Sequence, residues 1–209
     1  AMTMSATSRP AQMRAEYTGV PLRAIAQLAK SWNFSEASFG MAALNSYYAT
    51  PSVADEHGFT LADAPWPHIF DPFREAVAGK KVAVIGHFPF APKALTQAAD
   101  FYMLERSLNE GDYPDSAAEY ILPECDYVFI TGSAFVNKTA PRLLELSRDA
   151  FNVILGPSTP LAPVLLEDYG VSLVTGMLPT SPLAMFEGLS GTDAATTMFE
   201  WGHRAELSA

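Results

Sequence analysis

The residues of this chain that could do chemistry gather in four short polar loops. The loops read GHFPF from residue 86, ERS from residue 105, TGSAFVNKT from residue 131 and GPSTPL from residue 156. Each follows or closes a short apolar run that is typical of a buried strand. The first loop contains His87, and histidine is the side chain that most often serves as a general acid or base. The pattern indicates proton transfer or ligand binding at one edge of a sheet.

The first two loops contain the titratable candidates. His87 either moves a proton or only hydrogen-bonds to neighbouring backbone. Glu105 lies about 20 residues past Gly86, where nucleotide-binding sheets commonly place an acid that binds ribose hydroxyls. The alternative is that Glu105 only pairs with Arg106 or Lys93. The first loop lacks the G-x-G-x-x-G pattern, which disfavours a dinucleotide site.

The third and fourth loops offer hydroxyl groups, an amide and backbone N–H groups close to helix starts. Asn137 is the candidate for orienting a substrate, and the backbone N–H groups of Gly132 and Gly156 could stabilise developing negative charge. The hydroxyls of both loops could instead only cap the helices that follow. Ser158 is not surrounded by a G-x-S-x-G sequence, which argues against a hydrolase nucleophile.

The elements that must position these loops are predicted to be strands of a parallel sheet. From residue 81 the apolar runs VAVIG, DFYMLER, CDYVFITG, FNVILGP and VSLVTG alternate with segments of helical period. Strands that are apolar on both faces and separated by helices indicate an α/β fold with a Rossmann-like, doubly wound, mostly parallel sheet. Ligands bind such sheets at the carboxyl ends of the strands, where the strand order reverses.

Four segments are expected along the chain. Residues 1–18 are polar and are predicted to be an extended or disordered arm. Residues 19–50 show two helical patterns, the second of them capped by Asn33 or Ser35. Residues 51–79 are rich in proline and aspartate and are predicted to be a linker. Residues 80–209 are predicted to be the Rossmann-like domain.

The composition limits the partners of the chain. Thirteen basic and 23 acidic residues give a formal charge of -10, which disfavours nucleic acids and anionic membranes. The single cysteine, Cys125, allows no internal disulfide and fits the cytoplasm, with a buried structural thiol as its expected state. The four histidines are far apart, so spacing supports no metal site, and the sequence identifies neither a metal nor a cofactor. The expected partner is a small-molecule ligand.

Four motifs in combination resemble one family. SWNFSEASFGMAALNSYY, KVAVIGHFPF, LPECDYVFITGSAFVNKT and GPSTPLAP are similar to the "putative heavy-metal chelation" family, over about residues 19–203. The resemblance implies an enolase N-terminal-like part joined to a Rossmann-like domain, with the site where the two meet. The resemblance also implies an enzyme that catalyses condensation or hydrolysis in the synthesis of pterins, flavins or siderophore-like chelators. The site residues it implies are Gly86, His87, Phe88, Glu105, Thr131, Gly132, Ser133, Asn137, Gly156, Pro157 and Ser158, with Trp32, Asn33 and Asn45 from the N-terminal helix.

The start of the chain departs from this family pattern. The sequence begins close to the family's first helices, so the strands that open the enolase-like part are expected to be absent or reduced to residues 2–17. A sheet edge left open in this way could be covered by a second copy of the chain, which favours a homodimer.

Three functions remain open from the sequence. The first is an enzyme in which His87 moves a proton while Glu105 and Asn137 orient the substrate. The second is a binding module for a metal chelate or a small anion, because few titratable groups occur in the loops. The third is a methyltransferase that uses S-adenosylmethionine, which Glu105 favours and the single glycine of the first loop disfavours.

Overall fold

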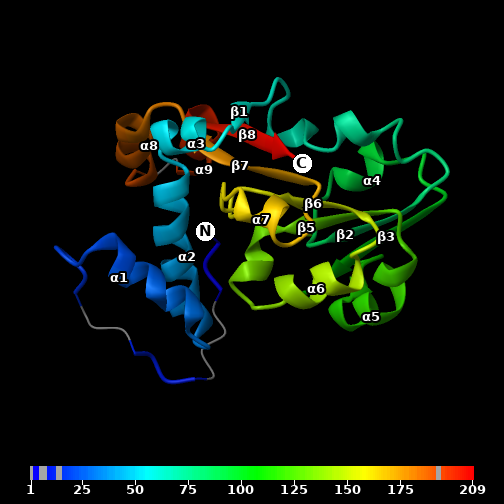
Figure 1. Cartoon of the computed structure of the whole chain (residues 1–209), viewed down its shortest axis with the longest axis horizontal. Helices are drawn as coiled ribbons and strands as arrows, with labels where there is room; N and C mark the ends of the chain where they lie inside the picture. The colour runs from blue at the N-terminus through cyan, green and yellow to red at the C-terminus, as the bar shows by residue number, and fades with distance from the viewer. Residues whose placement is uncertain (1, 5–8, 13–15, 192–193) are drawn as a thin grey trace.

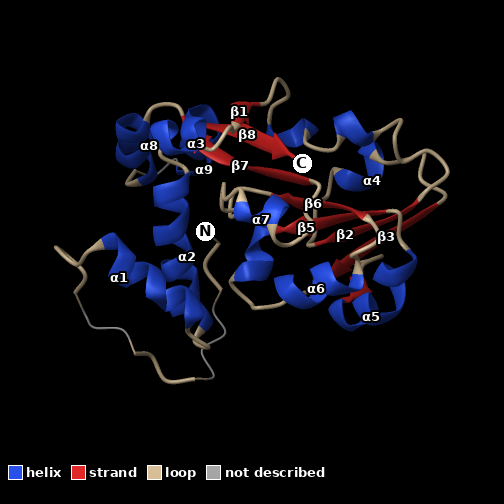
Figure 2. Ribbon diagram, viewed as in Figure 1, coloured by secondary structure: helices blue, strands red, loops and turns tan. Residues whose placement is uncertain are grey.

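The computed structural model describes residues 2–4, 9–12, 16–191 and 194–209 of the chain. One sheet runs through it, with helices on both faces (Figures 1 and 2). Its strands lie in the order β1-β8-β7-β6-β5-β2-β3-β4. In chain order they are β1 (Thr60–Leu61), β2 (Lys81–Ile85), β3 (Asp100–Glu105), β4 (Tyr113–Pro114), β5 (Tyr127–Thr131), β6 (Phe151–Leu155), β7 (Leu173–Pro179) and β8 (Gly202–Ser208).

Strands β2 to β7 pair in parallel with one another, whereas β8 pairs antiparallel with both of its neighbours, β7 and β1. The predicted mixed α/β fold with a mostly parallel sheet is therefore confirmed. From β2 the chain moves to β3 and β4 on one side, then returns to β5, β6 and β7 on the other. The strand order reverses between β2 and β5, so the carboxyl ends of these two strands mark the expected place for a ligand.

Both faces of the sheet are covered, which explains why its strands are apolar throughout. Helices α5 (Ala118–Ile121), α6 (Ala140–Leu146) and α7 (Val164–Glu167) pack on the face that carries Ala83, Val128 and Ile130. The opposite face carries Val82, Val84 and Phe129, and it packs against α4 (Ala91–Ala94) and residues 66–77. In Figure 1, α4 lies above the sheet and α5 and α6 lie below it.

The proline-rich segment 51–79, predicted to be a linker, contributes to this core. It contains α3 (Pro51–Glu56) and the edge strand β1, which pairs with β8. Trp66, Ile69 and Phe70 are buried, and Phe70 is 0% exposed. The ring of Phe70 lies 5.2 Å from that of Phe129 on β5, and it also contacts Phe88 and Phe90. Through these contacts the segment supports the loop that carries His87.

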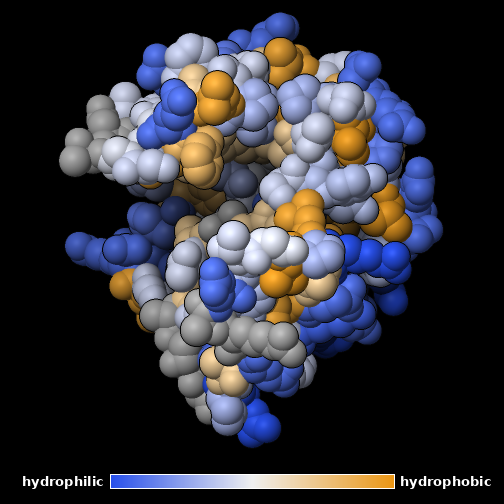
Figure 3. Space-filling view, turned by 90° about the vertical axis from the view of Figure 1, so that its left-hand side faces the viewer, coloured by the Kyte–Doolittle hydropathy of each residue, from blue (hydrophilic) through white to orange (hydrophobic). Residues whose placement is uncertain are grey.

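The N-terminal helices α1 (Leu22–Ala26) and α2 (Phe34–Tyr48) stand beside the sheet (Figure 1). Asn33 caps α2, because its side chain accepts a hydrogen bond from the backbone N–H of Glu36. Asn33 is one of the two residues predicted to cap this helix. Ala37 and Met41 of α2 pack against Val136, which follows β5. Seen from the side of α1, α2 and α8 (Pro182–Leu189), the surface is deeply hollowed near its centre (Figure 3).

Helix α9 (Ala194–Trp201) leads directly into β8. Among the described residues no helix is both long and apolar enough to cross a membrane. The two outermost strands, β1 and β4, have two residues each, and β4 ends in Pro114. Short edge strands and proline discourage pairing with another sheet. The homodimer stays a prediction, and these described edges give no support to an edge-to-edge version of it.

Candidate functional site

A cleft lies over the point where the strand order reverses. It has a volume of about 500 Å³ and is bordered by Gly86 after β2 and Thr131 at the end of β5. A side chain at Gly86 would lie 3.1 Å from Cγ2 of Thr131, and the backbone there has φ of +105°. Glycine therefore allows the two loops to approach closely. The predicted site residues that line the cleft are Gly86, His87, Phe88, Glu105, Thr131, Ser133, Asn137, Gly156, Pro157 and Ser158.

His87 pairs with a carboxylate that the sequence analysis did not identify. Its Nδ1 lies 3.0 Å from Oδ2 of Asp112, in the loop between β3 and β4. The Asp112 side chain is 0% exposed, whereas 32% of the His87 side chain is exposed. The backbone N–H and side-chain amide of Asn109 also donate to Asp112, at 2.9 and 3.2 Å. A carboxylate that is covered from solvent thus holds the imidazole at the edge of the cleft.

The charge of Asp112 decides which ring nitrogen of His87 carries the hydrogen. Burial raises the pKa of the Asp112 carboxyl, but hydrogen bonds from Asn109 and His87 outweigh burial and leave this pKa below its usual value. An ionised carboxylate only accepts hydrogen bonds, so Nδ1 of His87 must be the donor. In the neutral ring, Nε2 is then the nitrogen that can accept a proton. This is the arrangement of a histidine base oriented by an acid.

Glu105 and Asn137 also lie in the cleft, but their side-chain oxygen atoms accept hydrogen bonds from other groups of the loops. Glu105 accepts hydrogen bonds from the backbone N–H groups of His87, Arg106 and Ser107, at 2.9, 2.6 and 3.2 Å. The carboxylate therefore shapes the loop that presents His87. Oδ1 of Asn137 accepts from the backbone N–H and hydroxyl of Thr139, which leaves its Nδ2 as the group able to serve a ligand.

Hydroxyl groups form the wall of the cleft at the ends of β5 and β6. Oγ1 of Thr131 lies 2.9 Å from Oγ of Ser133. Ser158 accepts a hydrogen bond from the backbone N–H of Met2 at 2.7 Å, so residues 2–4 also border the cleft. These groups supply neutral donors and acceptors, whereas Arg106 is paired with Asp115 at 2.9 Å.

Four predicted site residues do not line the cleft, and one of them, Trp32, is 66% exposed. Gly132 packs behind it, where an added side chain would lie 2.4 Å from the backbone nitrogen of Thr159. Asn33 caps α2 and donates to the backbone carbonyl of Arg9. Asn45 donates from Nδ2 to the backbone carbonyl of Ser158 at 2.9 Å, and so joins α2 to the loop after β6. Through these hydrogen bonds, Asn33 and Asn45 position the neighbouring loops and helices.

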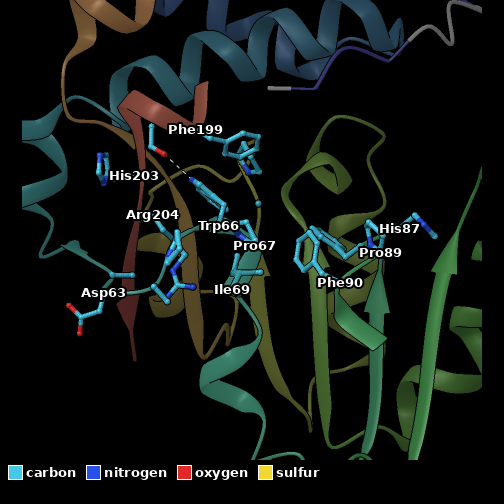
Figure 4. Close-up of a pocket in the computed structure, with 17 residues that line it drawn as sticks. Asp63, Trp66, Pro67, Ile69, His87, Pro89, Phe90, Phe199, His203 and Arg204 are labelled. Carbon is cyan, nitrogen blue, oxygen red and sulfur yellow. Dashed lines mark hydrogen bonds between the residues drawn. The ribbon is translucent and has the colours of Figure 1, made fainter. Parts of the chain in front are cut away.

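A second cavity, of about 730 Å³, adjoins the cleft along His87, Phe88, Gly156 and Pro157. We call it the aromatic pocket because Trp66, Phe88, Phe90 and Phe199 line it. Figure 4 shows the ring of His87 turned away from this cavity, in agreement with the bond between His87 and Asp112. The imidazole therefore belongs to the cleft.

The residues of the cleft do not make a three-ligand metal site. No group of three or more histidine, cysteine, aspartate or glutamate side chains in the described part of the chain is placed to share one ion. Zinc in proteins is normally held by three or four such ligands. Cys125 is buried, and burial raises its pKa to about 11, so its thiol stays protonated at neutral pH. The described histidine, cysteine, aspartate and glutamate side chains therefore offer no site of the zinc type.

The lowered pKa of Asp112 predicts a pH-dependent contribution to stability. A carboxyl group whose pKa falls on folding stabilises the protein at pH values above its pKa in the unfolded chain, here 3.8. This stabilisation is lost as the pH falls through the lower pKa of the folded protein. We expect Asp112→Asn to lower the free energy of unfolding at pH 7, and the difference from the wild type to shrink toward pH 3. Urea unfolding at both pH values measures this.

Asp149→Asn is the matched control for that experiment, because the Asp149 side chain is 91% exposed. We expect it to change the free energy of unfolding by no more than about 0.5 kcal/mol at either pH. A loss for Asp112→Asn that is equal at pH 7 and pH 3 would contradict an ionised, hydrogen-bonded Asp112.

Comparisons with known proteins agree with the fold and identify the family. Two family models match, each described as "Putative heavy-metal chelation": one over residues 68–204 and one over residues 1–48. A crystal structure of a protein of unknown function from Desulfitobacterium hafniense is 44% identical, with a TM-score of 0.79. The superposition covers 90% of this chain and 74% of that one.

Two archaeal proteins are also similar. A structure from Pyrococcus horikoshii has a TM-score of 0.76 over 98% of this chain and 80% of that one, at 22% identity, which shows the fold alone. An uncharacterized protein from Methanocaldococcus jannaschii is 30% identical over 99 residues. That match spans 44% of this chain and only 38% of the archaeal protein. The match to residues 68–204 covers most of this chain, which therefore belongs to the family described as "Putative heavy-metal chelation".

Proposed function

We propose that the protein is an enzyme that uses His87 to move a proton on a small organic molecule bound in the cleft. One observation carries this proposal: Nδ1 of His87 is held 3.0 Å from the carboxylate of Asp112, whose side chain is 0% exposed. A histidine that serves only in packing, or in hydrogen bonds to the backbone, does not need a solvent-covered carboxylate as its partner. A positioned imidazole of this kind typically contributes about 10²–10⁴-fold to a reaction.

The substrate class follows from the family and from the ligands of the cleft. The family is described in terms of heavy-metal chelation, yet no three-ligand metal site forms among the described side chains. A metal can also be handled through an organic chelator, whose own atoms bind the ion. The cleft offers neutral hydroxyls and one amide beside the imidazole. We therefore propose a precursor of an organic chelator, of the pterin, flavin or siderophore-like class, as the substrate.

The proposed chemistry is condensation or hydrolysis, because both need a proton to move while a bond to carbon forms or breaks. In hydrolysis, Nε2 of His87 accepts a proton from water as the oxygen attacks a carbonyl carbon of the substrate. Asp112 stabilises the imidazolium that results, and the ring returns the proton to the leaving group. Thr131, Ser133 and Nδ2 of Asn137 orient the substrate by hydrogen bonds. Glu105 acts through the loop that it holds.

A binding module is the second candidate, and the contacts of Glu105 and Arg106 favour it. Both are engaged by other groups of the protein, so His87 has few charged neighbours free to act on a ligand. Such a module would bind a metal chelate or a small anion and release it unchanged. The methyltransferase has less support, because both carboxylate oxygens of Glu105 already accept backbone hydrogen bonds.

Incubation of the purified protein with a small-molecule cell extract, followed over time by mass spectrometry, separates these functions. The enzyme proposal predicts ions that decline and ions that grow. In hydrolysis the masses of the two products sum to that of the substrate plus one water, and in condensation the product weighs one water less than its two precursors together. A binding module predicts an ion that is retained by the protein, recovered after denaturation and unchanged in amount. Growth of a product heavier by one methylene group, only when S-adenosylmethionine is added, would support the methyltransferase instead.

A further inference from the structure

The aromatic pocket contains a buried cation with unsatisfied donors. Arg204, on β8, is 4% exposed and lines this cavity. Its Nε and Nη1 are buried and have no hydrogen-bond partner among the described residues. Its Nη2 lies 3.5 Å from Oε2 of Glu206, whereas a charge-assisted hydrogen bond is typically about 2.7–2.9 Å long. Glu206 therefore does not saturate the guanidinium.

The guanidinium remains charged in this position. Burial lowers the pKa of Arg204, and Glu206 and Asp63 act in the opposite direction. Arginine nevertheless stays protonated in proteins at neutral pH. A buried charge that lacks full hydrogen bonding is unfavourable and calls for a partner. The partner that suits it is an anion with acceptor oxygens.

The other walls of the pocket are aromatic and firmly placed. Nε1 of Trp66 donates to the backbone carbonyl of Gly202 at 3.0 Å, which ties segment 51–79 to the start of β8. Figure 4 shows Trp66, Pro67, Ile69 and Arg204 gathered on one side of the cavity, with Pro89 and Phe90 facing them. Phe199 of α9 lies at the top in the same view. Aromatic rings favour a flat apolar ligand between them.

From these observations we infer that the aromatic pocket binds a small planar aromatic acid, with its carboxylate at Arg204 and its ring between Trp66 and Phe90. The volume of about 730 Å³ lies within the usual range for small-molecule sites. Few polar groups converge on an otherwise apolar wall, which is how such sites fix the orientation of a ligand. This site goes beyond the proposed function, and direct binding tests it without reference to turnover.

The probes are 2-naphthoate and its neutral analogue 2-naphthylmethanol, titrated into the protein by calorimetry. We expect the acid to bind at least about tenfold more tightly than the alcohol, because only the acid pairs with the guanidinium. In Arg204→Met, a substitution of similar length, the two affinities become equal. In Phe199→Ala, whose side chain is 51% exposed in the wild type, both ligands weaken by the same factor.

Equal affinities of acid and alcohol for the wild type, or an unchanged ratio in Arg204→Met, would overturn the inference and leave water as the partner of the guanidinium. A crystal structure of the wild type with 2-naphthoate keeps the test decisive even if Arg204→Met does not fold. A carboxylate within hydrogen-bonding distance of Arg204 supports the site, and a naphthoate bound elsewhere overturns it.

Discussion

Replacing His87 by glutamine lowers the rate of the reaction in the cleft by about 10²–10⁴-fold. Glutamine can still donate a hydrogen bond to Asp112, so the loop keeps its shape, but its amide cannot accept and return a proton. The loss therefore falls on the chemical step. The measurement is the rate at which wild type and variant convert the substrate ions into the product ions, at equal protein concentration.

The chain supplies a matched control for that substitution. His68 also pairs with an aspartate, since its Nδ1 lies 2.7 Å from Oδ2 of Asp71, but it lines neither the cleft nor the aromatic pocket. His68→Gln removes a histidine–aspartate pair on the surface and should retain the wild-type rate. If His87→Gln also retains it, the proton-transfer role of His87 is wrong.

Replacing Phe70 by alanine destabilises the protein by about 3–5 kcal/mol, the usual cost of removing a buried phenylalanine ring. Phe70 is fully buried, and its ring contacts those of Phe88, Phe90 and Phe129. The cavity left behind would lie beneath the loop that presents His87. Urea unfolding followed by circular dichroism gives the difference in free energy.

Phe186→Ala is the control for the change at Phe70, because the Phe186 side chain on α8 is 71% exposed. Removal of an exposed ring should change the free energy of unfolding by no more than about 0.5 kcal/mol. A comparable, small effect at Phe70 would mean that segment 51–79 is a loose linker. The large effect that we expect would make this segment part of the folded core.

The parallel part of the sheet could be predicted from the sequence because its strands are buried on both faces. Each of β2, β3, β5, β6 and β7 is a compact apolar run with its own sequence signature. Strand β8 has no such signature, since it reads GHRAELS and includes Arg204 and Glu206. Its position depends on pairing with β7 along seven residues, a tertiary contact that local pattern does not encode.

The candidate site was predictable to the level of loops but not of partners. Parallel topology brings the loops after β2, β3, β5 and β6 to one edge, so their residues meet in the cleft. Asp112 was missed because it lies beyond the ERS loop, seven residues after Glu105. The signal in the sequence is a turn at Gly111, where φ is +91°, followed at once by an acid. The backbone contacts of Glu105 likewise depend on how the loop folds.

The most direct test of the central claim is the tautomer of His87 in the neutral ring. Long-range ¹H–¹⁵N correlation spectra of histidine-labelled protein in mildly alkaline buffer distinguish a protonated Nδ1 from a protonated Nε2, and His87→Gln identifies the signals of this residue among the four histidines. We predict a hydrogen on Nδ1 and a free Nε2, as the bond to Asp112 requires. A hydrogen on Nε2 would show that Asp112 does not orient the imidazole, and the proposed proton transfer would lose its structural basis.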